Sequence, residues 1–600
     1  MKLRISLILC LLVASASATA QAQKKPANAK AFIDEVNRAM KKLYAEVSTA
    51  EWIRATYSTD DTERNAAYFN EQQLAYRAKA IGEASRFVGK KADPDTTRML
   101  HLLRSSVDLS APSDAARRSE LAQISARMAG MYSRGKVCGP DGKEPCRALV
   151  ELHDVMAKSR SWDELISIWS GWHAVGAQMR PLYQRFAELG NQGAREIKFA
   201  DMGEQWRARY DMSPAEVEKE VDRLWGQVKP LYLDLHCKVR TELAKTYGAD
   251  KVPPGKPIPA HILGNMWAQE WGNIYPLVEP YKGQVSLDVD GALQAQKYDE
   301  IKMTKMAEGF FVSLGLDKLP DTFWERSMLK KPRDRDVECH ASAWDVSAEG
   351  DVRIKMCIRP VEEDLVTIHH ELGHVYYYNY YHNLPILYQD GANDGFHEAI
   401  GDAIALSITP GYLKQMGLLK EVPTDEKGLI NVQMKDALDK VAFLPFGISL
   451  DKWRWNVFNG KIKPADYNKA WWDIRREYQG IVPPVARSEK DFDPGAKYHI
   501  PANTPYLRYF LARILQFQFH RALCRAAGHT GPLHQCSIYG NKAAGEKLRA
   551  MLALGASKPW PDALEALTGE RTMDAGAMLE YFAPLQAWLK EQNKGQTCGW

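Results

Sequence analysis

The stretch VTIHHELGHVYYYNYY, from Val366 to Tyr381, determines how the rest of the chain is interpreted. Within it, His370 and His374 are four positions apart and Glu371 follows the first histidine, which is the H-E-x-x-H pattern. Residues four apart lie on one face of a helix, so both imidazoles can reach one zinc ion while Glu371 lies beside its bound water. The pattern predicts a helix with a zinc site, and the alternative is an ordinary polar turn on an exposed helix.

A zinc site needs a third protein ligand, and the segment GANDGFHEAIGDAIALSI offers two candidates, His397 and Glu398. Glu398 follows His374 by 24 residues on a second predicted helix. We prefer Glu398 because Asp402 lies four residues later on the same helical face, where a carboxylate can orient a ligand imidazole. The predicted ligand set is therefore two histidines and one glutamate.

This ligand set leaves the fourth position of the metal open for water, which is typical of a catalytic site and not of a structural one. Zinc lowers the pKa of its bound water and polarises a carbonyl group. Glu371 is the candidate general base that takes the proton from this water and later delivers it to the leaving amine. The sequence therefore indicates hydrolysis of an amide bond, with a peptide carbonyl as the electrophile.

The composition is that of a globular protein. Of the 600 residues, 45% are hydrophobic and 26% are charged, which is the usual range. The 79 lysines and arginines nearly balance the 75 acidic residues, which gives a net charge of +4. This balance argues against a nucleic-acid-binding protein and a membrane-surface protein, since neither sign of charge dominates.

Helical periodicity dominates the chain. Phe32, Val36 and Met40, for example, follow one another at helical intervals. Strand-like segments are few, and the clearest, SAWDVSAEGDVRIKMCI, is expected to form a hairpin that turns at residues 349–350. We therefore predict a large all-α protein with very little β-structure.

The N-terminal sequence MKLRISLILCLLVASASATAQAQ has the features of a secretory signal peptide over residues 1–20, with cleavage after Ala20 or Ala22. Its apolar run is too short to span a bilayer, and no later segment is apolar over a spanning length. We therefore expect a secreted or periplasmic protein without a membrane anchor. The remaining chain has no Asn-x-Ser/Thr sequon, which favours a bacterial periplasm.

An oxidising compartment permits disulfides. Without Cys10 in the leader, eight cysteines remain. Cys237 and Cys598 could pair with each other, stay free or join two chains. The other six suggest three local pairs: Cys138 with Cys146, Cys339 with Cys357, and Cys524 with Cys536.

Beyond the zinc pattern, a series of sequence blocks resembles the angiotensin-converting enzyme family of zinc peptidyl-dipeptidases. The blocks are PIPAHILGNMWAQ, ECHASAWD, HHELGH, GFHEAIGDAIALS, AFLPFGISLDKWRW, YQGIVPPVAR, GAKYHIPANTPYLRYF and LQFQFHRALC. The similarity begins near Lys30, is densest from Pro257 onward and contains one copy of the catalytic unit. It implies a single catalytic domain over residues 23–597, and its disulfides match the three local pairs.

The resemblance also implies an architecture and a substrate class. The fold would be a large helical ellipsoid of two subdomains, split by a deep internal groove with one zinc ion at its floor. Helices within residues 30–104 would form a lid that excludes folded proteins. The expected substrates are short peptides with a free C-terminus, and chloride is the expected activator.

The family's site residues have counterparts at matching positions. The counterparts of the metal ligands, the base and the supporting carboxylate are His370, His374, Glu398, Glu371 and Asp402. Tyr509 matches the phenol that stabilises the oxyanion of the tetrahedral intermediate. His340 and His499 match the pair that hydrogen-bonds the substrate backbone, and His499 is counted with Tyr509 among the expected catalytic residues. The backbone of Ala341 would lie antiparallel to the bound peptide.

Three further matches concern specificity. Gln269, Lys497 and Tyr506 match the residues that bind the substrate's terminal carboxylate at a distance from the zinc that fits two residues. The resemblance thus implies release of C-terminal dipeptides. A related carboxypeptidase branch has arginine where Gln269 stands and releases one residue, which makes carboxypeptidase activity one alternative. Others are an oligopeptidase that cuts internally and a non-catalytic peptide-binding protein on the same scaffold.

The chloride sites of the family are matched in part. Tyr210 and Arg508 match the second site, whereas at the first site Trp471 and Arg475 match but His173 replaces an arginine. One fewer permanent charge makes the first site doubtful, or dependent on pH if His173 titrates.

Two more positions depart from the family pattern. Arg513 replaces a phenylalanine near the pocket for the last substrate residue, and we expect it to shift preference there towards acidic or polar side chains. Asp394 replaces a proline shortly before Glu398, and the sequence alone suggests no consequence.

Overall fold

The described part of the chain is almost entirely α-helical. A computed structural model describes residues 28–139, 145–283, 288–422 and 425–600. Among these residues only six short strands occur, and they pair two by two. The all-α fold class is therefore confirmed, whereas the predicted signal peptide lies outside the described residues. None of the described helices is both long and apolar enough to cross a membrane.

Helices α1 to α13 belong to the first part of the described chain, and α9, with 34 residues, is the longest of them. Their bounds are α1 (Ala29–Thr56), α2 (Asp60–Ala84), α3 (Pro94–Ser105), α4 (Ala115–Ser133), α5 (Leu149–Lys158), α6 (Trp162–Ala177), α7 (Arg180–Glu196), α8 (Met202–Arg207), α9 (Pro214–Tyr247), α10 (Tyr275–Val278), α11 (Val289–Ala295), α12 (Glu300–Ser313) and α13 (Asp321–Arg326).

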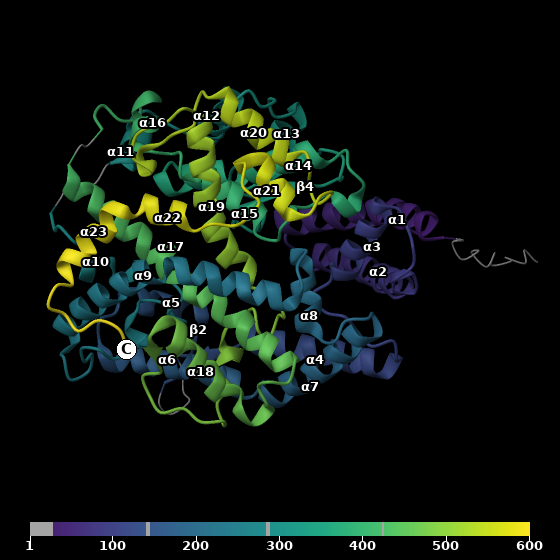
Figure 1. The fold of residues 1–600 in the computed structure, drawn as a ribbon, viewed down its shortest axis with the longest axis horizontal. Coiled ribbons are helices and arrows are strands. Elements are labelled where there is room, and N and C mark those ends of the chain that lie inside the picture. The colour runs from purple at the N-terminus through teal and green to yellow at the C-terminus, as the bar shows by residue number, and fades with distance from the viewer. Residues whose placement is uncertain (1–27, 140–144, 284–287, 423–424) are drawn as a thin grey trace, which may run out of the picture.

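The second part of the chain supplies the helices that carry the predicted metal site. They are α14 (Glu362–Tyr381), α15 (Phe396–Ala405), α16 (Pro410–Gln415), α17 (Glu426–Phe458), α18 (Tyr467–Gln479), α19 (Leu507–Ala526), α20 (Lys542–Leu552), α21 (Trp560–Thr568), α22 (Gly576–Tyr581) and α23 (Ala583–Gln592). In Figure 1, α14, α15 and α19 lie in the upper part of the molecule and α5, α6 and α18 in the lower part.

The N-terminal helices α1, α2 and α3 form a unit with a small core of its own. Asn28 and Asp93 cap the N-termini of α1 and α3, because their side chains accept hydrogen bonds from backbone N–H groups of the first helical turn. Phe32, Val36 and Met40 are buried in this core, as the periodicity predicted, and Leu387 joins them from the 3₁₀ helix η5 (Ile386–Tyr388). The three helices lie together at one end of the molecule (Figure 1). Their span closely matches residues 30–104, the predicted lid.

Helix α15 lies between α14 and α19, and two glycines allow its close approach to α14. A Cβ atom on Gly373 of α14 would lie 2.8 Å from the Cα atom of Gly401 on α15. A Cβ atom on Gly401 would lie 2.7 Å from Nδ1 of His370. Any larger residue at either position would push the helices apart. The glycines therefore set the distance at which the histidines of α14 meet the carboxylates of α15.

The strands are short, with two to four residues each. The pairs are β1 (Lys136–Val137) with β2 (Arg147–Ala148), antiparallel; β3 (Ile258–Pro259) with β6 (Ile481–Val482), parallel; and β4 (Ser342–Asp345) with β5 (Val352–Lys355), antiparallel. The β4–β5 hairpin turns through residues 346–351, where Gly350 has a φ of 89°, so the predicted turn is confirmed.

Four disulfides cross-link the described chain. The three local pairs predicted from the sequence are present, and Cys237 of α9 is bonded to Cys598 near the C-terminus. This fourth bond joins residues 361 positions apart. Arg240, one turn after Cys237, donates hydrogen bonds to the carbonyls of Thr597 and Gly599, which holds the same terminal segment against α9.

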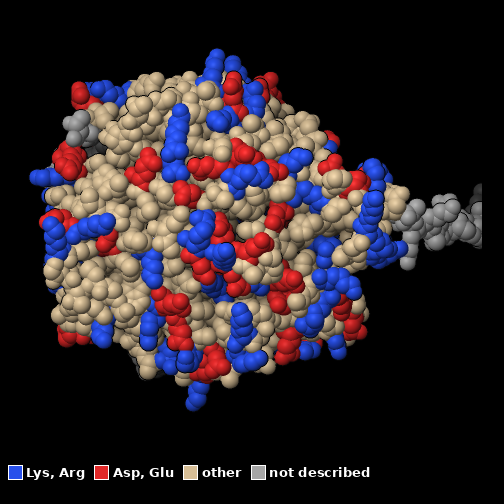
Figure 2. Space-filling view, in the orientation of Figure 1, with Lys and Arg blue, Asp and Glu red and all other residues tan. Residues whose placement is uncertain are grey.

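The surface carries charges of both signs. On the face drawn in Figure 2, lysine and arginine side chains alternate with aspartate and glutamate side chains, and neither sign forms a continuous field. This distribution matches the near balance of 79 basic and 75 acidic residues.

Candidate functional site

The two histidines of α14 and one glutamate of α15 converge on one point. Nε2 of His370 lies 3.1 Å from Nε2 of His374 and 3.6 Å from Oε2 of Glu398. The ligand atoms of the three residues all lie within 4.8 Å of one another. The ligand set predicted from the sequence is thus brought together by the fold.

The remaining nitrogens of these histidines point away from that centre to fixed partners. Nδ1 of His370 lies 3.0 Å from Oδ1 of Asp402, and Nδ1 of His374 lies 3.3 Å from Nδ1 of His397. His397, the rival ligand, is therefore behind His374, and its Nε2 lies 3.0 Å from the Tyr381 hydroxyl. With Nδ1–H groups donated outward, the two Nε2 atoms face each other with lone pairs, an arrangement that fits a bound zinc ion.

Asp402 is held as a carboxylate by two partners. Burial alone would raise its pKa, but the hydrogen bond from His370 and the charge of Arg513 outweigh burial and lower the pKa well below its ordinary value. Arg513 Nη1 lies 3.2 Å from Oδ2 of Asp402, and its Nη2 lies 3.6 Å from Oδ1 of Asp439. The positive charge of Arg513 is therefore paired with two carboxylates of the protein, so less of it acts on a substrate side chain than its sequence position suggested.

Glu371 faces an open pocket of about 850 Å³. His370, Asp402, His340 and Ala341 also line this pocket. Burial, followed by the nearby charge of Glu398, raises the pKa of Glu371 above its ordinary value even though His370 opposes the shift. A carboxylate with a raised pKa is a stronger base, which suits the role predicted for Glu371.

His340 and Ala341 lie on the segment that enters strand β4. Nδ1 of His340 lies 2.9 Å from the carbonyl oxygen of Ala341. Lys355 of β5 donates a hydrogen bond of 2.7 Å to the His340 carbonyl, and the Cys339–Cys357 disulfide joins the two ends of the hairpin. The strand that would align a peptide is thereby fixed beside Glu371.

Tyr509, Tyr506 and His499 form an aromatic cluster at the start of α19. The His499 ring lies 4.6 Å from Tyr506 and 5.9 Å from Tyr509, measured between ring centroids. Burial and the neighbouring cations Lys497 and Arg454 lower the pKa of His499 to about 3, so its imidazole is neutral at physiological pH. Burial raises the pKa of Tyr509, which keeps its phenol protonated as a hydrogen-bond donor.

Lys497 is buried among polar and aromatic side chains. Its Nζ atom donates a 2.5 Å hydrogen bond to Oε1 of Gln269 and lies 4.0 Å from the Trp267 ring centroid and 5.6 Å from that of Tyr506. Burial lowers the pKa of Lys497 to about 7, although Glu270 opposes this shift. The three residues predicted to bind a terminal carboxylate thus lie together.

Two residues that the sequence interpretation missed hold this region in place. Asp451 of α17 accepts hydrogen bonds of 2.8 Å from the backbone N–H groups of Tyr506 and Leu507, where α19 begins. Arg454, one turn later on α17, donates a 2.8 Å hydrogen bond to the His499 carbonyl. Both residues lie in the block AFLPFGISLDKWRW, so its similarity to the family was the available signal.

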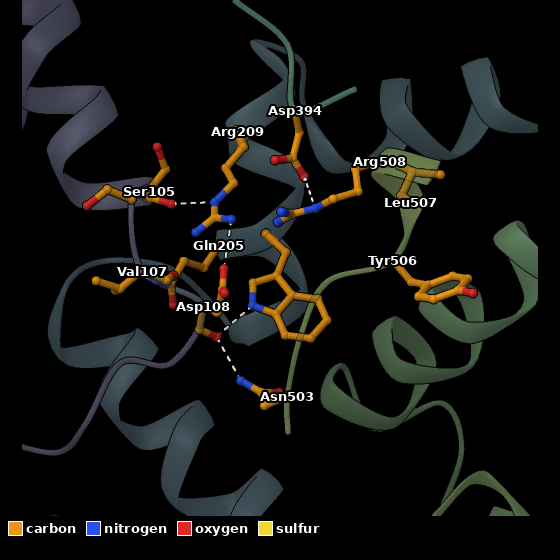
Figure 3. A network of polar contacts seen from close by, with 12 residues as sticks. Ser105, Val107, Asp108, Gln205, Arg209, Asp394, Asn503, Tyr506, Leu507 and Arg508 are labelled. Carbon is orange, nitrogen blue, oxygen red and sulfur yellow. Dashed lines mark hydrogen bonds and ion pairs between the residues drawn. The ribbon is translucent and has the colours of Figure 1, made fainter. Parts of the chain in front are cut away.

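The two predicted anion sites differ in their surroundings. At the second site a carboxylate is already present: Oδ2 of Asp394 lies 3.0 Å from Nε of Arg508 and accepts a 3.4 Å hydrogen bond from the Tyr210 hydroxyl. Figure 3 shows the guanidinium of Arg508 directed at Asp394.

At the first site, Arg475 is buried, and no carboxylate in the described part of the chain is in hydrogen-bonding contact with it. It donates to the Gln479 side chain and, over 2.5 Å, to the Trp267 carbonyl, and it lies 5.2 Å from the Trp471 ring centroid. Burial lowers the pKa of Arg475 to about 9. Burial also lowers the pKa of His173 to about 4, so His173 is neutral at physiological pH and does not replace the missing positive charge.

Comparison with known proteins gives matches over nearly the whole chain. A family profile described as angiotensin-converting enzyme matches residues 23–600. The angiotensin-converting enzyme of Rattus norvegicus is 44% identical over 585 residues, which cover 96% of this chain and 44% of that protein. That of Theromyzon tessulatum is 41% identical over 586 residues, which cover 96% and 94%. The chain thus spans less than half the length of the mammalian relative.

Proposed function

Because the chain belongs to the angiotensin-converting enzyme family, we propose that it is an exported zinc peptidyl-dipeptidase that removes C-terminal dipeptides from short peptides. The observation that carries this proposal is the convergence of His370, His374 and Glu398. His370 and the candidate base Glu371 also line one open pocket. The four disulfides support export, because such bonds are typical of oxidising compartments.

The residues of the site can be given roles in peptide hydrolysis. His370, His374 and Glu398 would hold the zinc ion, which when bound polarises a carbonyl group and acidifies a water molecule. Glu371 takes the proton of the attacking water, which its raised pKa favours. The protonated Glu371 then delivers this proton to the nitrogen of the leaving dipeptide.

Neutral hydrogen-bond donors would bind the oxygen atoms of the substrate. The Tyr509 phenol is protonated and would donate a hydrogen bond to the oxygen that gains charge in the transition state. His499 and His340 would hydrogen-bond backbone groups of the peptide. The segment at Ala341 would pair with the peptide as an added strand.

The group formed by Lys497, Gln269 and Tyr506 would account for the proposed position of cleavage. A buried ammonium whose nearest partner is the neutral Gln269 side chain is a receptor for a carboxylate, and the neighbouring Tyr506 adds a phenol. By the family resemblance, these three residues would lie two substrate residues beyond the scissile bond. Helices α1 to α3 are the proposed lid that admits only short peptides.

The experiment is cleavage of an N-terminally blocked tripeptide, with products identified by mass spectrometry. We expect a free dipeptide, and we expect its formation to stop with a chelator, to return with added zinc and to stop in Glu371→Gln. Glu362→Gln, an exposed position at the start of the same helix that does not line this pocket, should leave activity unchanged.

Release of a single amino acid from the tripeptide would instead establish the carboxypeptidase alternative. Cleavage of none of a panel of short peptides by zinc-loaded protein would establish the non-catalytic peptide-binding alternative. Cleavage of longer peptides only at internal bonds would establish an oligopeptidase.

A further inference from the structure

A carboxylate of the protein stands between the two groups that the sequence matched to an anion site. Asp394 contacts Arg508 at 3.0 Å (Figure 3). It also accepts a 3.4 Å hydrogen bond from the Tyr210 hydroxyl. The side chains of Asp394 and Arg508 are 18% and 26% exposed, and Tyr210 is 3% exposed. The pair is therefore mostly buried, where a charge without its partner is costly.

The neighbouring charges are already engaged with each other. Arg209 Nη1 lies 2.7 Å from Oδ1 of Asp108, and its Nε donates a 2.6 Å hydrogen bond to the Ser105 carbonyl (Figure 3). Arg209 is therefore bound to the last residue of α3 and to Asp108, which follows that helix. Asp394 is left as the carboxylate in contact with Arg508.

This ion pair joins the starts of α15 and α19, two of the helices that carry predicted reacting groups. Asp394 immediately precedes Gly395, the N-cap residue of α15, whose first turn holds Glu398. Arg508 is the second residue of α19 and immediately precedes Tyr509. A Cβ atom on Gly395 would lie 3.1 Å from the Arg508 carbonyl oxygen, so the two backbones touch at this point.

We propose that Asp394 is a positioning residue that acts as a built-in anion, holding Arg508 and Tyr210 so that Glu398 and Tyr509 face each other in the active arrangement. The proposal rests on the proposed function, because it concerns how that reaction's residues are placed. At this position the protein then needs no anion from solution. A small anion would bind here only after the Asp394 carboxylate is removed.

Two substitutions at Asp394 separate loss of charge from loss of volume. Asp394→Ala leaves a cavity beside an uncompensated guanidinium and a phenol, which is a receptor for formate or chloride. Asp394→Asn also removes the charge but fills the same space, so it leaves no room for an anion. Rescue of the first variant and not of the second is the specific signature.

The experiment measures kcat and KM for the blocked tripeptide at constant ionic strength while formate or chloride replaces gluconate. We expect Asp394→Ala in gluconate to lose about 10- to 100-fold in kcat, as expected for misplaced reacting groups, with a smaller change in KM. Formate should raise the kcat/KM of Asp394→Ala relative to wild type by about tenfold, whereas Asp394→Asn should stay low.

The matched control is Asp574→Ala. Asp574 pairs with Arg521 on the same helix α19, also at 3.0 Å, but far along the helix from Tyr509. This control should keep wild-type kcat and gain no activity from formate. A wild-type response to chloride at another site cancels in the ratio of variant to wild type.

A second readout does not depend on activity. Formate should raise the melting temperature of Asp394→Ala more than that of wild type or Asp394→Asn, because a ligand that binds only the folded state stabilises it. If wild type cleaves no peptide, the proposed function has failed, and the melting temperatures still decide the anion site. The inference would be overturned if formate had the same effect on Asp394→Ala and Asp394→Asn. It would also be overturned if formate changed neither the ratio of kcat/KM between Asp394→Ala and wild type nor the melting temperature of Asp394→Ala specifically.

Discussion

Two largely buried cations of the predicted site, Lys497 and Arg508, have different interaction partners in the structure. Lys497 has a neutral amide as its hydrogen-bond partner, and burial lowers its pKa to about 7. Arg508 is also buried, but the charge of Asp394 more than offsets burial and raises its pKa above the ordinary value. The difference separates a ligand-binding role from a structural one. A buried cation that is not paired with a carboxylate of the protein can bind the carboxylate of a ligand, whereas a paired cation stabilises the structure.

The largest expected effect is at Lys497. Lys497→Met removes the charge that would bind the substrate's C-terminus, and losing one partner of a desolvated charge pair costs about 2 to 5 kcal/mol. We expect kcat/KM for a blocked tripeptide to fall by about 100-fold. Steady-state kinetics checks this, with Lys452→Met as the control, because Lys452 pairs with Asp222 at 2.6 Å and belongs to no predicted site. Equal losses in both variants would contradict the comparison.

The next effect is on pH dependence. Only the ammonium form of Lys497 attracts a carboxylate, and its pKa of about 7 lies within the working range. As pH rises above about 7, the fraction of charged Lys497 falls, so kcat/KM should decrease by up to about tenfold per pH unit until another group dominates. The profile of kcat/KM against pH, measured for wild type and Lys497→Met, checks this. A Lys497→Met profile with the same high-pH limb would show that another group titrates there.

The smallest expected effect concerns Arg475, which is a third buried cation. It donates hydrogen bonds to the side-chain amide of Gln479 and to the backbone carbonyl of Trp267. By the same comparison it should behave as a receptor for a small anion. We expect chloride to raise wild-type kcat/KM by about twofold at constant ionic strength, within the range of modest allosteric coupling. Arg475→Lys should weaken the chloride dependence. A chloride response that persists unchanged in this variant would place the anion elsewhere.

Much of the metal site follows from local spacing, because the helical period fixes which residues share a face. His370 and His374 had to lie together once α14 formed, and Glu398 with Asp402 once α15 formed. The local disulfides and the β4–β5 turn were accessible for the same reason, since their partners are close in sequence. The resemblance then supplied the distant members of the site, including Lys497 and Gln269.

The features that sequence reasoning left open or missed depend on pairs far apart in the chain. Cys237 and Cys598 meet because the C-terminal segment returns to α9, and no local pattern encodes that path. Asp394 forms an ion pair with Arg508, which lies 114 positions later in the chain, and no local sequence pattern indicates this contact. Arg513 was expected to face substrate, whereas Asp402 and Asp439 pair with its charge.

The central claim is that Lys497 receives a terminal carboxylate while the three metal ligands and Glu371 act on the bond two residues before it. The most direct test compares wild-type kcat/KM for one blocked peptide in two forms, with a free and with an amidated C-terminus. The account predicts that the free form reacts at least about 100-fold faster and yields a dipeptide. Equal rates for the two forms, with the same bond cleaved, would contradict it.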